Sequence, residues 1–107
     1  MRRAVIDLGT NTFNLLIADT QSRQILFQTK EGVALGMGGI NEKRISDEAM
    51  ARAFEALRQF KAHCTQWQVE DIQAIGTSAL RDATNAQALL CKVQDELQFA
   101  VEIITGQ

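Results

Sequence analysis

Apolar residues near the N-terminus form two short runs separated by four small or polar residues. The first run covers 4–8 and the second covers 13–18, and each contains one polar residue, Asp7 and Asn14. Between the runs stand Gly9, Thr10, Asn11 and Thr12, which are residue types common in turns. Short apolar runs on either side of a turn predict two strands in an antiparallel hairpin.

A third strand is predicted after a second polar turn at 20–23. The stretch 24–33 alternates over part of its length between apolar and polar side chains. The alternation puts Ile25, Phe27 and Thr29 on one face. Gln24, Gln28 and Lys30 lie nearer the other. Such a strand has one face in water, and we expect it at an edge of the sheet.

Two later stretches show the spacing of an amphipathic helix. The first helix is predicted to begin at Ser46, whose hydroxyl can accept a hydrogen bond from the first turn. The second is predicted to begin at Asn85, which can cap in the same way. We assign both apolar stripes to the core: Met50, Ala53, Phe54, Leu57, Phe60, Cys64 and Trp67 in the first helix, and Ala86, Leu89, Leu90, Val93 and Leu97 in the second.

Two further strands are predicted at 71–76 and 99–105, each after a helix. A connection from strand through helix to parallel strand is almost always right-handed. The tight turns make the first three strands neighbours, and the crossovers then place the fourth beside the first and the fifth outside it. The predicted fold class is α/β, a mixed five-stranded sheet in order 3-2-1-4-5 with helices packed on it, and 1–107 forms a single unit.

The end of the first strand carries the first candidate site. Asp7 precedes the turn Gly9, Thr10, Asn11 and Thr12, which offers backbone N–H groups and two hydroxyls at close range. Backbone N–H groups can hold phosphate oxygens, and a carboxylate can hold a cation or a water molecule. The alternative is a tight hairpin in which Asp7 caps its own turn. These residues by themselves leave both interpretations open.

A second candidate site lies where the fourth strand leads into a helix. Gly76, Thr77 and Ser78 form a turn whose N–H groups point outward, and Arg81 follows within reach. The alternative is a Thr77 or Ser78 cap with Arg81 as a surface charge. In the predicted sheet order this turn and the first turn meet at the same end of neighbouring strands, which favours phosphate binding.

Composition and charge argue against some classes of protein. The chain has 107 residues and a formal net charge of −2, so a general nucleic-acid surface is not expected. No apolar run is long enough to cross a membrane, and we expect a cytoplasmic location. Cys64 and Cys91 fit no zinc-site spacing and are expected as reduced, mostly buried thiols, with His63 on a solvated helix face.

A glycine-rich stretch at 35–40 is a third place where phosphate could bind. It carries Gly36, Gly38 and Gly39, but no Lys-Ser or Lys-Thr pair follows them, so the P-loop pattern is absent. Nor does the stretch open directly onto a helix. We interpret it as a connection between the third strand and the first helix, and its role stays open.

The topology resembles the ribonuclease-H-like half-domain of the actin, sugar kinase and Hsp70 superfamily. Within it, Asp7-Leu8-Gly9-Thr10-Asn11-Thr12-Phe13-Asn14-Leu15-Leu16 and Gly76-Thr77-Ser78-Ala79-Leu80-Arg81-Asp82-Ala83-Thr84-Asn85 are similar to motifs of the exopolyphosphatase and guanosine pentaphosphate phosphohydrolase (Ppx/GppA) family. The resemblance implies a phosphoanhydride hydrolase that acts on inorganic polyphosphate, guanosine penta/tetraphosphate, or both.

The resemblance also implies roles for single residues. Asp7 would lie beside Mg²⁺, Gly9–Thr12 would form the first phosphate loop, and Arg81 would bind a substrate phosphate with Asn85 supporting the helix start. Many members of the family carry Arg or His where this chain has Asn14. The family's proteins continue past Gln107, where the general base is expected, so we expect the chain to be the first half-domain of a longer parent that is itself a homodimer.

Two other functions remain as alternatives. The first motif also permits a phosphotransferase half-domain of the sugar or acetate kinase type, whereas the block at 76–85 argues against it. A non-catalytic module that binds polyphosphate or nucleotide is the second alternative. For the 107 residues taken alone we expect weak phosphate binding and no hydrolysis, since no general base is apparent among them.

Overall fold

The computed structural model describes residues 1–36 and 44–104, apart from the side chains of Ser78 and Ala79. The predicted glycine-rich connection therefore lies largely outside the described residues, as does Gln107. The elements follow the order β1 (Arg2–Leu8), β2 (Thr12–Asp19), β3 (Gln24–Gly32), α1 (Asp47–Gln66), β4 (Asp71–Gly76), α2 (Ser78–Asp82), α3 (Ala86–Lys92), the π-helical turn η1 (Val93–Leu97) and β5 (Val101–Ile103).

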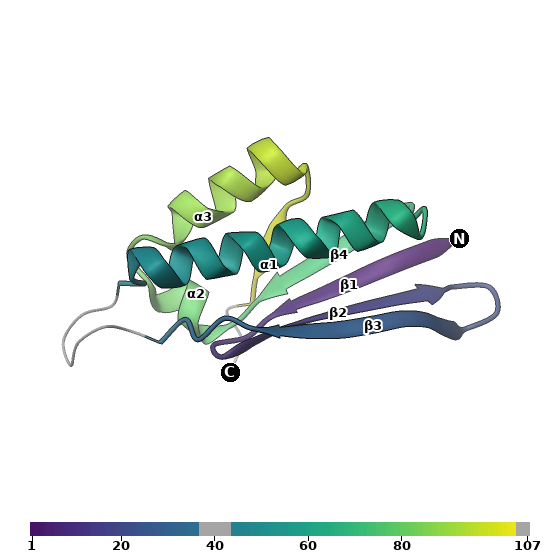
Figure 1. Ribbon diagram of the computed structural model, residues 1–107, viewed down its shortest axis with the longest axis horizontal. Coiled ribbons are helices and arrows are strands. Elements are labelled where there is room, and N and C mark those ends of the chain that lie inside the picture. Colours follow the sequence, from purple (N-terminus) through teal and green to yellow (C-terminus); the bar gives the residue numbers. More distant parts are fainter. Residues whose placement is uncertain (37–43, 105–107) are drawn as a thin grey trace.

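The strands form one mixed sheet in the order β3-β2-β1-β4-β5, which confirms the predicted topology (Figure 1). β1 lies at the centre, antiparallel to β2 and parallel to β4. β4 in turn pairs in parallel with the short strand β5. The ends of β1 and β4 that carry the two candidate turns therefore lie side by side at one end of the sheet.

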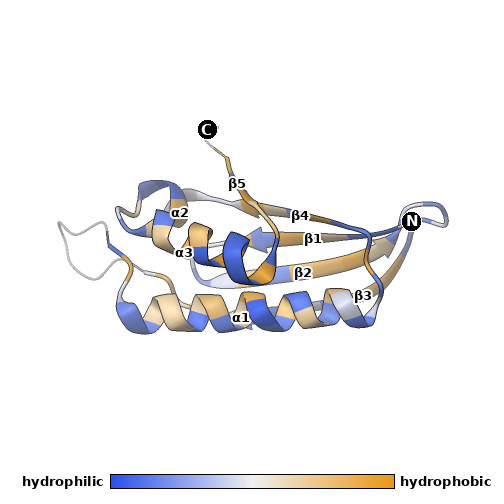
Figure 2. Cartoon of the chain, turned by 90° about the horizontal axis from the view of Figure 1, so that it is seen from above, coloured by the Kyte–Doolittle hydropathy of each residue, from blue (hydrophilic) through white to orange (hydrophobic). Residues whose placement is uncertain are grey.

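All described helices cover the same face of the sheet, as Figures 1 and 2 show from two directions. Alternate residues of β1 point into the resulting core, and Ala4, Ile6 and Leu8 are essentially inaccessible to solvent. Val5 and Asp7 point to the opposite face, which no described helix covers. The sheet thus has one packed face and one open face.

Helix α1 buries most of its predicted apolar stripe in the core, while Met50, Phe54 and Trp67 of that stripe are only half-buried. The Ser46 hydroxyl accepts a hydrogen bond from the Ala49 N–H at 3.1 Å, which confirms the predicted cap. The expectation of a solvated His63 is wrong, because its ring packs against Phe27 at a centroid distance of 4.7 Å. Aromatic pairs at this separation are favourable, which accounts for a half-buried histidine on this helix.

The third strand departs from the prediction at its start. The register between β2 and β3 shifts between Ile17 and Ala18, so that Ala18 lies opposite Ile25 while Ile17 lies opposite Phe27. The irregularity moves Ile25 onto the open face, where it is 60% exposed. The prediction that Ile25 shares a face with Phe27 is therefore wrong, because one additional residue reverses the alternation.

The C-terminal part contains two further departures. β5 begins at Val101, while Phe99 is buried ahead of the strand, after Gln98 turns the chain with a positive φ of 64°. The expectation of two mostly buried thiols holds for Cys64, where burial raises the pKa to about 11, but Cys91 is exposed. Within the described ranges, no helix combines the length and the apolar character that crossing a membrane requires.

Candidate phosphate site

The turn between β1 and β2 is closed by its own backbone. The Gly9 N–H donates to the Thr12 carbonyl at 3.2 Å. A side-chain Cβ at Gly9 would come within 2.9 Å of the same carbonyl oxygen, so the close approach requires glycine here. The N–H groups of Leu35 and Val33 donate to the carbonyls of Thr10 and Asn11 at 2.8 and 2.9 Å. The segment after β3 therefore holds the turn in place.

The second turn is joined directly to the first. Both the N–H and the hydroxyl of Thr77 donate to the Leu8 carbonyl, at 3.3 and 3.2 Å. The predicted meeting of the two turns is thus present in the structure, with Thr77 as the connection. Both donors of Thr77 therefore already have a protein acceptor, and only the lone pairs of its hydroxyl, which accept hydrogen bonds, remain for a ligand.

Arg81 lies on the short helix that follows this turn. Its backbone N–H donates to the Thr77 carbonyl at 3.0 Å, and its Nε lies 3.2 Å from Asp82 Oδ1. Both partners are well exposed, with Arg81 at 38%, and such surface ion pairs contribute only about 0–1 kcal/mol. A phosphate could therefore compete with Asp82 for the guanidinium. The backbone of Ser78 begins this helix, while its side chain lies outside the described part.

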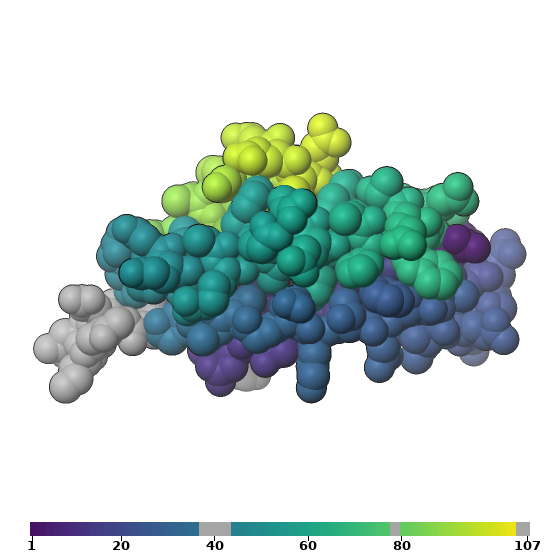
Figure 3. Space-filling view, viewed as in Figure 1, coloured from purple at the N-terminus to yellow at the C-terminus, as the bar shows by residue number. Residues whose placement is uncertain are grey.

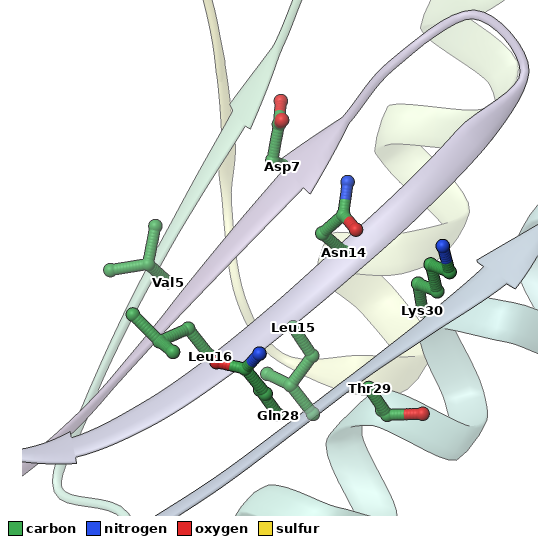
Figure 4. Close-up of a pocket in the computed structure, with 8 residues that line it drawn as sticks. All are labelled: Val5, Asp7, Asn14, Leu15, Leu16, Gln28, Thr29 and Lys30. Atoms are coloured by element: carbon green, nitrogen blue, oxygen red, sulfur yellow. The ribbon is translucent and has the colours of Figure 1, made fainter. Parts of the chain in front are cut away.

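Asp7 stands on the open face beside the joined turns. It is exposed and lies between Asn14 of β2 and Ile75 of β4 in the sheet register. A hollow of about 560 Å³ opens next to it (Figure 4), lined by Val5, Asp7, Asn14, Leu15, Leu16, Gln28, Thr29 and Lys30. The carboxylate and both turns thus share one end of the sheet, next to a ligand-sized depression.

The profile of the Ppx/GppA phosphatase family matches residues 16–107 of the chain. The chain belongs to this family. A guanosine-5'-triphosphate,3'-diphosphate pyrophosphatase of Photobacterium profundum is 37% identical over 106 residues, which are 97% of this chain and 21% of that protein. The family predicted from the two motifs is therefore confirmed.

Solved structures of the family share the fold. The structure of an exopolyphosphatase from Cytophaga hutchinsonii ATCC 33406 matches with a TM-score of 0.91 and 42% identity over 97% of this chain and 34% of that chain. The Aquifex aeolicus member of the Ppx/GppA family matches with a TM-score of 0.89 and 27% identity over 97% and 35%. The chain thus spans between a fifth and about a third of the length of these relatives.

The described residues of this Ppx/GppA chain fit a magnesium ion only in combination with a bound phosphate. Within residues 1–36 and 44–104, no three His, Cys, Asp or Glu side chains are grouped closely enough to hold a metal by themselves. Asp7 supplies a single exposed carboxylate beside the turns. Mg²⁺ is commonly held by one or two carboxylates together with substrate phosphates and water, so this donor set fits the ion once phosphate is present.

Asn85 does not support the helix start in the way the sequence suggests. It occupies the N-cap position of α3, but its side chain makes no capping hydrogen bond. Its amide instead pairs with the backbone of Ile45, accepting at 3.0 Å and donating at 2.8 Å. The predicted cap is wrong, because a partner forty positions away in the chain satisfies both polar atoms. Asn85 thereby ties the block that carries Arg81 to the start of α1.

Proposed function

We propose that this chain supplies the phosphate-binding half of a phosphoanhydride hydrolase that releases terminal phosphate from inorganic polyphosphate or guanosine pentaphosphate. One observation carries the proposal. Two hydrogen bonds from Thr77 to the Leu8 carbonyl hold the two candidate phosphate-binding turns together beside Asp7. The names of the relatives, an exopolyphosphatase and a guanosine-5'-triphosphate,3'-diphosphate pyrophosphatase, support the class of substrate.

In this proposal the turns bind and orient the terminal phosphate for in-line attack by water. N–H groups of the turn at 9–12 donate to its oxygens, apart from that of Gly9, which the Thr12 carbonyl accepts, and the Arg81 guanidinium neutralises charge on the transferred group. Asp7 would hold Mg²⁺ together with substrate oxygens, and the ion supplies further positive charge there. We place the general base outside this chain, in the part of the relatives' length that it does not span.

Hydrolysis is preferred over the phosphotransferase alternative because the matched family is one of phosphatases. The non-catalytic module remains the competing function for the 107 residues taken alone. We further propose that the parent protein is a cytoplasmic homodimer. Light scattering of the purified parent tests the dimer, and fractionation of the source cells tests the compartment.

Binding of pyrophosphate to the 107-residue chain in the presence of Mg²⁺ tests the proposed site directly. Arg81→Gln is expected to weaken binding by about ten- to a hundredfold, since a charge-assisted hydrogen bond contributes about 1.5–3 kcal/mol, and Asp7→Asn should weaken it by removing the carboxylate proposed to hold Mg²⁺. Arg58→Gln on α1 is a matched control that removes one exposed cation elsewhere, and it should leave the dissociation constant unchanged. Equal effects of Arg81→Gln and Arg58→Gln would contradict the assignment of Arg81.

A further inference from the structure

The ladder between β2 and β3 stops halfway through a hydrogen-bonded pair beside the first turn. The register ends with Thr12 opposite Gly32, so Asn11 and Val33 come next. In an antiparallel ladder, the two residues of a hydrogen-bonded pair exchange both of their N–H···O bonds. Here the Val33 N–H donates to the Asn11 carbonyl at 2.9 Å, but within residues 1–36 and 44–104 the return bond from the Asn11 N–H is not made. The turn thus keeps an N–H group that the ladder would otherwise use.

The carbonyl that this return bond would need is occupied by an arginine of α1. Arg52 Nε donates to the Val33 carbonyl at 3.0 Å, and Arg52 Nη2 donates to the Ala34 carbonyl at 3.2 Å. Among the described residues Arg52 makes no ion pair, so the two carbonyls are its polar partners. Figure 3 shows α1, in teal, lying along β3, in blue, and the hollow between them is lined by Arg52 together with Glu31 and Gly32.

Arg52 binds the backbone on both sides of a residue in an uncommon conformation. Ala34 has a φ of 47°, in the left-handed region that residues with a Cβ rarely adopt. Its neighbours Val33 and Leu35 are fully buried, and the Leu35 N–H donates to the Thr10 carbonyl at 2.8 Å. Such a conformation persists only where the surrounding contacts hold it. The guanidinium of Arg52 supplies two of these contacts.

The same arrangement sets the direction of one N–H group of the turn. A planar trans peptide group directs its C=O and its N–H to opposite sides, and the described residues contain no cis peptide bond. Because the Thr10 carbonyl accepts from Leu35, the Asn11 N–H of the same peptide group is directed away from 33–35. A backbone N–H without a protein acceptor can donate to an anion. The contacts of Arg52 are thus connected to the candidate phosphate site through this peptide group.

We propose that Arg52 is a positioning residue of the phosphate site, which holds 33–35 in the conformation that directs the Asn11 N–H to the ligand and not into the ladder. The inference rests on the proposed function, since it concerns the same turn. Arg52 acts from α1, on the packed side of the sheet, and touches no ligand itself. Without it, Ala34 can relax and the peptide group between Thr10 and Asn11 can rotate, so that the Asn11 N–H donates to the Val33 carbonyl.

Two variants of Arg52 separate hydrogen bonding from charge. Arg52→Met and Arg52→Gln both change the formal net charge from −2 to −3, but only glutamine carries a donor nitrogen at the place of the arginine Nε. Titration calorimetry with pyrophosphate and Mg²⁺ should show binding about ten- to a hundredfold weaker for Arg52→Met, because one charge-assisted hydrogen bond is lost. Arg52→Gln should restore most of the affinity. Arg58→Met, on the same helix, is the matched control and should leave the dissociation constant unchanged.

Hydrogen exchange at the Asn11 amide gives a readout that a general loss of stability would not produce. In the unaltered chain this amide should exchange rapidly, and pyrophosphate should slow the exchange. In Arg52→Met it should exchange slowly even without pyrophosphate, because the Val33 carbonyl accepts its hydrogen bond. A loss of stability would instead speed exchange across the chain, since it raises the population of opened states.

The outcomes separate this inference from the proposed function. If the unaltered chain binds pyrophosphate and Arg52→Met binds it equally well, the positioning role is overturned while the proposed function stands. Equal losses for Arg52→Met and Arg52→Gln overturn it too, as does bound pyrophosphate that leaves the exchange of the Asn11 amide in the unaltered chain unchanged. If the unaltered chain binds no pyrophosphate, the proposed function fails and the inference fails with it.

Discussion

Gly9 shows how one backbone contact fixes the shape of the first turn. The space that a Cβ would need is occupied by the Thr12 carbonyl oxygen, 2.9 Å away, and that oxygen also accepts the Gly9 N–H. A carbonyl cannot rotate aside as the end of a flexible side chain can. The turn therefore depends on the absence of a side chain at this residue.

We expect Gly9→Ala to destabilise the chain by about 1–3 kcal/mol, because the Thr12 carbonyl must move and its hydrogen bond lengthens. Urea unfolding followed by circular dichroism measures the change. Gly32→Ala is the matched control, since a Cβ there meets nothing within 4 Å. The explanation fails if both substitutions have the same effect on the midpoint.

Asn85 carries a second prediction, because its amide satisfies both backbone groups of Ile45. Asn85→Ala leaves a part-buried N–H and C=O without their partner, which should cost about 1–3 kcal/mol. Gln94→Ala, at an exposed residue of η1, should change the unfolding free energy by less than about 0.5 kcal/mol. Similar losses for the two variants would show that Asn85 contributes no more than an ordinary surface residue.

Glu55 gives a prediction about pH. The hydrogen bond from Arg58 lowers the pKa of this carboxyl from 4.5 to about 2, with Gln59 adding a second hydrogen bond. Since the pKa is lowered in the folded chain, the pair stabilises it fully above pH 4.5 and loses this effect as the pH falls towards 2. NMR titration should show the low midpoint, and Arg58→Gln should raise it. If Arg58→Gln leaves the titration midpoint of Glu55 unchanged, something other than Arg58 must lower the pKa of this carboxyl.

Among the elements, β3 has some features that the alternation of side chains predicts and others that it does not. Its position at the sheet edge and its wet face follow from the alternation of side chains. The shift between Ile17 and Ala18 does not, because an additional residue in one strand leaves no trace in composition. The alignment of Asp7, Asn14 and Lys30 across β1, β2 and β3 could not be predicted for a related reason, since it depends on the register of three strands at once.

The helices likewise combine local contacts that the sequence predicts with long-range contacts that it does not. The cap at Ser46 is local, so its residue and its partner lie within one turn and the sequence predicts it. The contacts of Asn85 with Ile45 and of His63 with Phe27 join distant segments, so local patterns cannot contain them. The candidate site was predictable as far as the turns and their meeting, because these follow from topology. The roles of Asp7, Thr77 and Arg81 in binding stay predictions.

For the molecule as a whole, the open face determines what the 107 residues can do alone. Within the described residues, Asp7 lies on this face and the two joined turns lie at the same end of the sheet. We expect the chain incubated with polyphosphate and Mg²⁺ to release no phosphate above a blank, since loss of a general base costs a factor of about 10²–10⁴ in rate. Phosphate release followed over hours is the measurement. Steady release that Asp7→Ala abolishes would show that a base exists within this chain.

The central strand also determines the order in which the chain can assemble as it is synthesised. β1 meets β2 after a turn of three residues, but its other neighbour is far along the chain, as the pair Arg3 and Asp71 with a separation of 68 residues shows. One edge of β1 therefore keeps its N–H and C=O groups unpaired until α1 and β4 have followed. Closing so long a loop is slow, and the 20-residue helix α1, which forms from local contacts, spans about 30 Å of it. The rate at which the sheet is completed should therefore follow the helix propensity of α1.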